Sequence, residues 1–198
     1  MVSDTLNMKP PLEERELLYA STRKQWREWL RKNHSAKKEI WLVYYKKHSN
    51  KIRIPYNDAV EEALCFGWID STVRTIDENK YAQRFSPRKA GSAYSQSNIE
   101  RLHALIKQKK VIKSVLDKLP KLPSVQSKAP DDIIESIKLD EKAWKNFQKL
   151  SDSYKRIRIA FIDGARKRPR EFEKRLRYFI KMTARNKLFG FGGIDKYY

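Results

Sequence analysis

Hydrophobic positions near the N-terminus follow first a helical and then a strand pattern. Residues 22–25 have the Thr-x-x-Gln spacing of a capping box. Trp26, Trp29 and Leu30 follow at the i, i+3, i+4 spacing of one helix face. We therefore predict a helix whose tryptophans belong to the core. Residues 40–45 are apolar at both odd and even positions, so both faces of a strand would be apolar. This pattern predicts a strand that is covered on both faces.

A second helix is predicted after Pro55. Asn57 is a candidate cap, and Val60, Ala63 and Leu64 form the apolar stripe. Gly67 suits the left-handed position that closes a helix. The helix is therefore expected to end immediately before the next strand.

Residues 69–86 read as a β-hairpin turning at residues 77–80, where Asn79 tolerates a positive φ. Its arms carry Arg74 and Arg84. A one-residue slip in register would decide whether the two arginines share a face, so the sequence leaves this open. A second capping box at residues 97–100 predicts another helix.

Residues 120–130 are rich in Pro, Ser and Lys, which is typical of a linker. After them, the apolar residues show only helical spacing. Helices are expected to start at Asp131 or Asp132, at Asp140, at Ser153 (with Ile157, Phe161 and Ile162 inward) and at Pro169. The fold class is therefore α+β and mainly helical: a small antiparallel sheet with helices, then a C-terminal helical bundle. The predicted segments are a leader (1–19), an α+β core (20–119), a linker (120–130), a helical tail (131–187) and a flexible tail (188–198).

The charge balance points to anionic partners. The 198 residues contain 44 Lys and Arg against 24 Asp and Glu, a formal net charge of +20. Long-range attraction of this size concentrates nucleic acid, acidic proteins or anionic membrane surfaces around a protein. Residues 151–190 hold thirteen Lys and Arg against four acids, and Tyr154 and Tyr178 within this segment are expected to reach bases. The predicted polyanion-binding residues are Arg156, Arg166, Lys167, Arg168, Arg170, Lys174 and Arg177. A solvated basic face is the alternative interpretation.

Other classes of chemistry find little support in the sequence. Cys65 is the single cysteine, so no internal disulfide is expected, and its place beside an apolar stripe predicts a buried thiol. Three scattered histidines without ligand spacing predict no metal site, and no nucleotide-binding motif suggests a cofactor. No signal peptide and no apolar run of about 20 residues are present, which predicts a cytoplasmic protein without membrane insertion. The oligomeric state is not indicated.

Residues 61–100 nevertheless hold charges, aromatics and turn residues close together. Guanidinium groups and loop hydroxyls (Ser86, Ser92 and Ser95) suit a carboxylate or a phosphate. The candidate pocket for a small anionic ligand comprises Glu62, Trp68, Asp70, Arg74, Arg84, Arg88 and Tyr94. A structural alternative is that Glu61 or Glu62 pairs with a hairpin arginine and braces the hairpin against the helix.

The chain also resembles the YdeI/OmpD-associated family, the bacteriocin-protection proteins. The resemblance rests on Trp26–Leu30, Asn33-His34, Glu61–Ser71, Arg84–Arg88, Ser92–Ser95 with Asn98, and, more loosely, Asn146–Ser151, Ala165–Pro169 and Arg175. This chain departs from the family pattern at Tyr94, at Lys109–Val111 and at Glu171-Phe172. The resemblance implies the fold above and a role in envelope stress or antimicrobial resistance.

The sequence thus favours a stress-related binding protein that engages nucleic acid without strong sequence preference. One alternative is an enzyme or small-anion sensor that uses the pocket around Trp68 and Arg88. Another is an adaptor for an acidic protein or a membrane surface. No catalytic motif is complete, which favours binding over catalysis.

Overall fold

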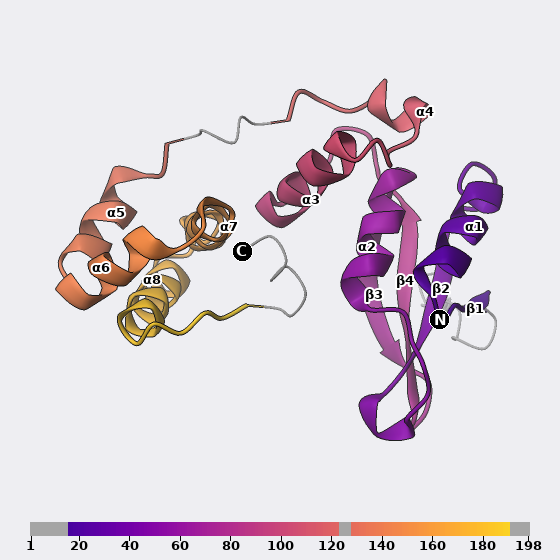
Figure 1. Ribbon diagram of the computed structural model, residues 1–198, viewed down its shortest axis with the longest axis horizontal. Coiled ribbons are helices and arrows are strands. Elements are labelled where there is room, and N and C mark those ends of the chain that lie inside the picture. The colour runs from indigo at the N-terminus through magenta and orange to yellow at the C-terminus, as the bar shows by residue number, and fades with distance from the viewer. Residues whose placement is uncertain (1–15, 123–127, 191–198) are drawn as a thin grey trace, which may run out of the picture. The chain divides into compact units, whose positions relative to one another are not determined.

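A computed structural model describes residues 16–122 and 128–190; the other parts of the predicted leader, linker and flexible tail lie outside the described residues (Figure 1). The chain forms two compact units. Of the described residues, the N-terminal unit holds 16–92 and 108–118, and the C-terminal unit holds 93–107, 119–122 and 128–190. The α+β class is confirmed. The helices and strands are β1 (Leu17–Tyr19), α1 (Arg23–Asn33), β2 (Ile40–Tyr45), η2 (Lys47–Ser49), α2 (Tyr56–Cys65), β3 (Trp68–Thr75), β4 (Lys80–Pro87), α3 (Gln96–Lys107), α4 (Lys113–Leu116), α5 (Asp131–Lys138), α6 (Glu141–Lys149), α7 (Asp152–Asp163) and α8 (Pro169–Ala184).

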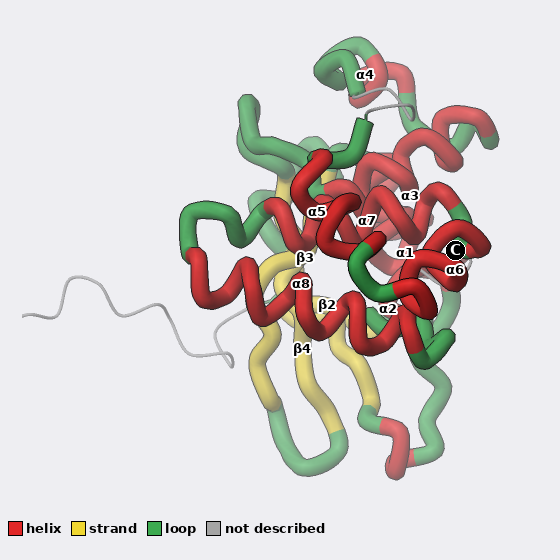
Figure 2. Tube along the Cα trace, turned by 90° about the vertical axis from the view of Figure 1, so that its left-hand side faces the viewer, coloured by secondary structure: helices red, strands yellow, loops and turns green. Residues whose placement is uncertain are grey.

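A four-stranded mixed sheet in the order β1-β2-β4-β3 forms the base of the N-terminal unit. β1 pairs in parallel with β2, so residues 17–19 belong to the sheet and not to a leader. β4 pairs antiparallel with both β2 and β3. Figure 2 shows β3 and β4 as a long hairpin whose loop closes one end of the sheet.

The tryptophans of α1 lie in the core, as the sequence predicts. The capping box forms: Thr22 accepts from the Gln25 N–H, and the Gln25 side chain reaches back to the Thr22 N–H. Trp26 is fully buried, lies 5.2 Å from the Phe85 ring and donates its indole N–H to the Ala59 carbonyl (2.9 Å). This indole therefore joins α1 to both α2 and the sheet.

The second helix begins two residues earlier than the predicted Asn57 cap implies. α2 starts at Tyr56 after Pro55, which places Asn57 in its first turn and makes the predicted Asn57 cap wrong. The helix closes at Gly67, which has φ of +72° as predicted. A Cβ there would also lie 3.1 Å from the Val115 side chain, so both backbone and packing favour glycine.

The hairpin turn depends on Asp77. Its carboxylate accepts the N–H groups of Asn79 (2.7 Å) and Lys80 (2.8 Å), and this side-chain turn makes the predicted positive φ at Asn79 unnecessary. The register places Arg74 opposite Ala82, two residues from Arg84. Opposed residues share a face and strands alternate with period two, so the two arginines lie on the same face of the sheet.

In the C-terminal unit, a carboxylate and a hydroxyl cap start α6 and α7. Asp140 caps α6, as predicted, whereas Ser151 and not Ser153 caps α7. The predicted capping box at residues 97–100 is wrong, because α3 begins at Gln96 and the Asn98 N–H donates to Ser95. The main core cluster of this unit consists of Ile133, Ile137, Ala143, Phe147, Tyr154, Ile159, Ile162 and Phe179. Among the described helices, none combines the length and the apolar character that a membrane crossing requires.

A buried ion-pair network joins α1 to α2. Glu61 and Glu62 are each 2% exposed. Arg23 bonds to Glu61 (2.8 Å) and to Glu62, and Arg27 also bonds to Glu62. The predicted pairing of Glu62 with a hairpin arginine is therefore wrong. Burial lowers the pKa of Arg23, but the bonds to the two carboxylates outweigh this effect and raise the pKa above its ordinary value.

We expect Arg23→Met to destabilise the N-terminal unit by about 3–5 kcal/mol, because it leaves two buried carboxylates without their shared partner. Lys24→Met is the matched control, since Lys24 is an exposed cation on the same helix. Urea unfolding followed by tryptophan fluorescence measures the effect, because four of the five tryptophans belong to this unit. Equal stability of the two variants would contradict the assigned role of Arg23.

Candidate anion-binding surfaces

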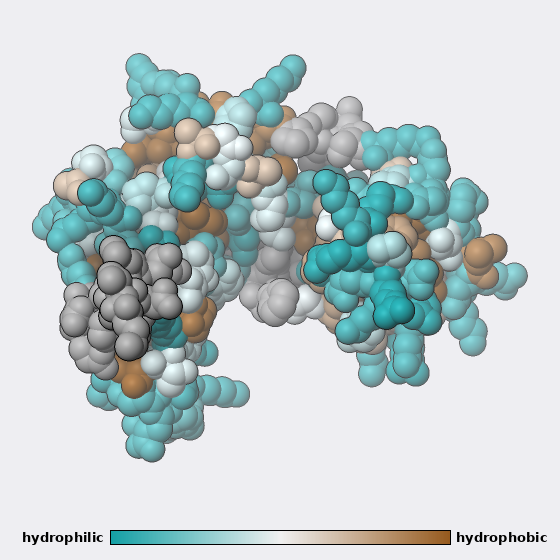
Figure 3. All heavy atoms as spheres, turned by 180° about the vertical axis from the view of Figure 1, so that it is seen from behind, coloured by the Kyte–Doolittle hydropathy of each residue, from teal (hydrophilic) through white to brown (hydrophobic). Residues whose placement is uncertain are grey.

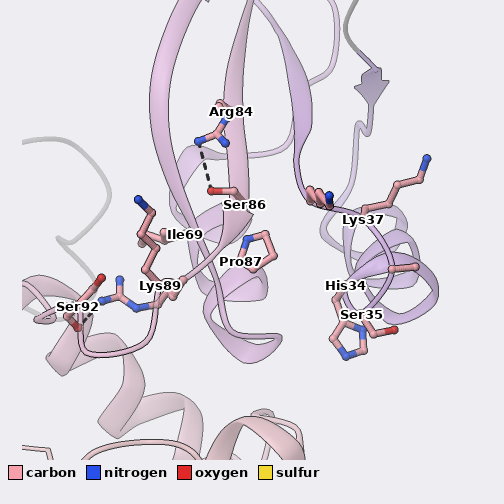
Figure 4. Close-up of a pocket in the computed structure, with 12 residues that line it drawn as sticks. His34, Ser35, Lys37, Ile69, Arg84, Ser86, Pro87, Lys89 and Ser92 are labelled. Atoms are coloured by element: carbon pink, nitrogen blue, oxygen red, sulfur yellow. Dashed lines mark hydrogen bonds between the residues drawn. The ribbon is translucent and has the colours of Figure 1, made fainter.

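A basic groove of about 740 Å³ lies in the N-terminal unit, at the end of β4. One wall is the loop of residues 34–38, and the other is the turn that follows β4 (Figure 4). Five cations line it: Lys37, Lys38, Arg84, Arg88 and Lys89. The described lining residues also include three serines (35, 86 and 92) and no carboxylate. We call this site the N-terminal basic groove.

Two cations of the groove are held in place by neighbouring carboxylates. Arg84 pairs with Glu39 (2.8 Å), which also accepts the indole N–H of Trp41 (3.0 Å). Lys37 pairs with Glu16 (2.6 Å). Lys38 and Lys89 are exposed and form no ion pair within the described residues, so they are the cations most open to an added anion.

The backbone around the groove is tied to the core. Arg88 donates its main-chain N–H to Gly67 (2.9 Å) and its guanidinium to the Ser92 carbonyl (3.1 Å). His34 faces the Leu30 carbonyl through Nδ1 (3.0 Å), so Nδ1 carries the proton because a carbonyl only accepts. The groove is therefore largely preformed.

The structure brings only part of the sequence-predicted pocket into this groove. Arg84 and Arg88 line it, together with Ser86 and Ser92. Trp68 is 1% exposed and donates to the His34 carbonyl (3.0 Å), so its ring is a core side chain and not a stacking wall.

The other predicted pocket residues lie away from the groove lining. Glu62 is buried in the network with Arg23. Asp70 accepts from Tyr56 (2.8 Å) and Gln83 (2.7 Å). The Arg74 guanidinium lies 5.8 Å from the Trp41 ring centroid. Tyr94 belongs to the C-terminal unit and is half-buried. Glu62, Asp70 and Arg74 thus contact other parts of the N-terminal unit outside the groove lining.

Sequence reasoning missed His34, Lys37 and Lys38. Antiparallel pairing of β2 with β4 matches Ile40 with Phe85, which carries the start of β2 to the end of β4. The Lys-Lys pair before the strand was visible in the sequence, but its strand partner was not. A correct β2–β4 register would have placed these residues opposite Arg88.

A second basic surface runs along α8 in the C-terminal unit. Arg170, Lys174, Arg177 and Lys181 follow at i, i+4, i+7 and i+11, so they fall within an arc of about 60° and a length of about 16 Å. All four are exposed, and none forms an ion pair within the described residues. Glu173 borders the row. We call these four residues the α8 cationic face; the spacing could have revealed Lys181, which the sequence analysis omitted.

Two further predicted residues, Lys167 and Arg168, lie immediately before α8. Arg168, with Arg170 and Lys174, lines a hollow of about 590 Å³. Lys167 is exposed beside it. Hydrophilic residues also cover most of the molecular face visible in Figure 3, where hydrophobic residues form separate patches.

Two predicted polyanion-binding arginines are instead neutralised. Arg156 forms a fork with Glu100 (2.7 and 2.9 Å), and that carboxylate is 7% exposed. Arg166 bonds to Asp132 (2.9 Å) and Asp163 (2.7 Å). Both arginines therefore join helices of the C-terminal unit, and carboxylates of the same unit neutralise most of their charge.

Two other side chains are buried. Tyr154 is 1% exposed, so its predicted contact with bases is wrong. Cys65 is fully buried, as predicted, and burial raises the pKa of its thiol to about 11, helped by the charge of Glu62. In the described parts of the chain, no group of three or more His, Cys, Asp or Glu is placed to hold a metal ion.

Two family matches cover most of the chain. Residues 18–118, just over half of the chain, match a domain of unknown function, DUF8412. The chain belongs to the DUF8412 family. Residues 127–186 match the OmdA domain, described as bacteriocin-protection, YdeI or OmpD-associated, which confirms that resemblance for the helical region. No curated protein and no solved structure matches. In this DUF8412 protein, the N-terminal basic groove lies within the first match and the α8 cationic face within the OmdA domain.

The Arg156–Glu100 pair makes stability depend on pH. Burial raises the pKa of Glu100, but bonds from Arg156 and Gln96 outweigh this and lower the pKa below its usual value of 4.5. The folded-state pKa is therefore depressed, so the stabilisation is present above about pH 4.5 and is lost as the pH falls further.

We expect Glu100→Gln to lower the free energy of unfolding at pH 7 by about 1–3 kcal/mol. The difference from the unmodified protein should shrink as the pH falls below about 4.5. Urea unfolding followed by far-ultraviolet circular dichroism between pH 7 and pH 3.5 tests this. A difference that stays constant over that range would show that the carboxylate is not ionised in the pair.

Proposed function

We propose that this protein binds polyanions through phosphate contacts on the α8 cationic face, and that nucleic acid bound without strong sequence preference is its ligand. The observation that carries the proposal is the exposed row of four cations, which the carboxylates of the described residues leave without ion pairs. Neighbouring Arg166 and Arg175 are paired with carboxylates, so the row is not simply the average surface of a basic protein.

The physical reason concerns counterion release. A cation that contacts a phosphate displaces a condensed counterion, whereas a cation already paired with a carboxylate gains much less from the exchange. The formal charge of +20 adds long-range attraction for any polyanion. Because phosphate contacts carry no base information, this mode of binding predicts weak sequence preference.

We expect the double variant Lys174→Gln/Arg177→Gln to bind a fluorescent oligothymidylate of 20 nucleotides more weakly than the unmodified protein does. Its log–log slope of affinity against salt should be shallower by about 1.4, since each single-strand phosphate contact contributes about 0.7. Fluorescence anisotropy across a salt series measures both quantities.

The matched control is Lys142→Gln/Lys145→Gln, which removes two exposed cations from α6 of the same unit. Equal losses in the two double variants would show that net charge, and not the α8 cationic face, determines binding. No binding by the unmodified protein at low salt would overturn the proposal. Binding to acidic proteins or to anionic vesicles would then become the next interpretation of the charge.

A second function is favoured by a separate observation. The N-terminal basic groove combines five cations with three serine hydroxyls in a volume typical of small-ligand sites. We propose that it binds a small anion carrying a phosphate or carboxylate group, as a sensor or as the substrate site of an enzyme. Lys38 and Lys89 are the exposed contacts, and Arg84 and Arg88 form the fixed part of the site.

We expect Lys38→Gln/Lys89→Gln to weaken the binding of inorganic pyrophosphate at least about tenfold, a loss of about 1.4 kcal/mol. Isothermal titration calorimetry at constant ionic strength measures it. Lys24→Gln/Lys32→Gln on α1 removes the same charge outside the groove and should bind normally. Identical pyrophosphate affinity in both double variants would remove the groove as the site.

A further inference from the structure

A second groove, of about 540 Å³, opens beside the α8 cationic face. Aromatic side chains from three segments line it: Phe161 of α7, Tyr178 of α8 and Phe189. Phe161 is 42% exposed and Tyr178 is 49% exposed. The sequence pattern predicted Phe161 as a core residue; the structure corrects this and leaves the ring at the groove. We call this site the aromatic groove.

The Phe161 wall is held in a fixed geometry. The Arg175 guanidinium lies 3.8 Å from the Phe161 ring centroid. Arg175 is itself held by Glu171 (2.8 Å) and by the Phe161 carbonyl (2.7 Å). Because its N–H groups are engaged by these two partners, the guanidinium is held over the Phe161 ring.

The other two aromatic side chains of the groove are also constrained. Tyr178 meets Phe189 edge to face, with ring centroids 4.8 Å apart. The Phe189 main chain both donates to and accepts from the Tyr154 hydroxyl (3.1 and 3.3 Å). Gly190 follows with a φ of +142°, a backbone conformation that L side chains rarely adopt, so glycine suits this position. The exposed Tyr178 is thus backed by an ordered segment.

The groove and the α8 cationic face share a residue. Lys174 lines the aromatic groove and also stands in the row between Arg170 and Arg177. A polymer whose phosphates follow the row would therefore pass the mouth of the groove. Single-stranded nucleic acid has this pattern of charge along the backbone and planar groups beside it, and its bases stack on aromatic rings and on arginine planes.

We infer that the aromatic groove accepts an unstacked base of a single-stranded nucleic acid whose phosphates contact the α8 cationic face. The inference rests on the proposed polyanion binding and specifies its ligand. A base within a duplex is stacked on both sides and cannot enter without leaving the stack. The groove volume lies within the range for small-ligand sites.

The test separates base contacts from phosphate contacts. An oligothymidylate of 20 nucleotides and a strand of 20 abasic tetrahydrofuran units carry the same phosphates, but only the oligothymidylate has bases. We expect the protein to bind the thymidylate at least about fivefold more tightly by fluorescence anisotropy, the lower end of the range for stacking of one base.

Three variants locate the contact. Tyr178→Ala should remove the preference while leaving affinity for the abasic strand unchanged; its partial exposure means that the truncation opens no core cavity. Tyr178→Phe should keep the preference, because the ring is retained. Leu139→Ala, at a residue 89% exposed and outside the groove lining, should behave like the unmodified protein.

The outcomes are distinguishable. Equal affinity of the unmodified protein for the two strands overturns the base contact and leaves polyanion binding standing. A preference that survives Tyr178→Ala places the base elsewhere and also overturns the inference. Failure to bind either strand overturns both the inference and the proposed function.

Discussion

The fold of this protein depends on pairing a small number of carboxylates with arginines at the places where helices meet. Glu61 and Glu62 are buried between α1 and α2 and bond to Arg23, and Glu100 of α3 is nearly buried against Arg156 of α7. A buried carboxylate without its partner costs several kcal/mol, whereas the intact pair contributes little net stability. The main effect of each pair is therefore to permit the two helices to pack around a buried charge. Removing the arginine from either pair would leave a carboxylate buried without its partner at the contact between two helices.

The same constraint determines the character of the surface. Even if every one of the 24 acids paired with a cation, 20 Lys and Arg would remain without a carboxylate. The ion pairs at Arg23, Arg156 and Arg166 use carboxylates for bracing, and the excess of positive charge therefore collects elsewhere. In the described residues, Lys38 and Lys89 of the N-terminal basic groove and the four cations of the α8 cationic face belong to this excess. The proposed binding therefore depends on which cations form ion pairs with carboxylates and which do not, more than on the total charge.

Local features of the fold were predictable because they depend on neighbouring residues. The Thr22 capping box, the β2 strand, the Gly67 helix end and the Asp140 cap each need only a few adjacent side chains. Ion-pair partners were not predictable in this way. Arg23 lies 39 positions from Glu62, and Arg156 lies 56 positions from Glu100. The sequence therefore suggested a hairpin arginine for Glu62 and a polyanion for Arg156. Phe161 shows the same limit for apolar residues, since helical periodicity could not tell a core position from the wall of a groove.

The central claim is that polyanions contact the α8 cationic face, and lysine footprinting tests it most directly. The protein would be acetylated at limiting reagent, with and without oligothymidylate, and modification at each lysine would be read by mass spectrometry. The account expects Lys174 and Lys181 to be protected in the complex while Lys142 and Lys145 of α6 react as in the free protein. Unchanged reactivity of Lys174 and Lys181 under conditions where the oligonucleotide is bound would contradict it.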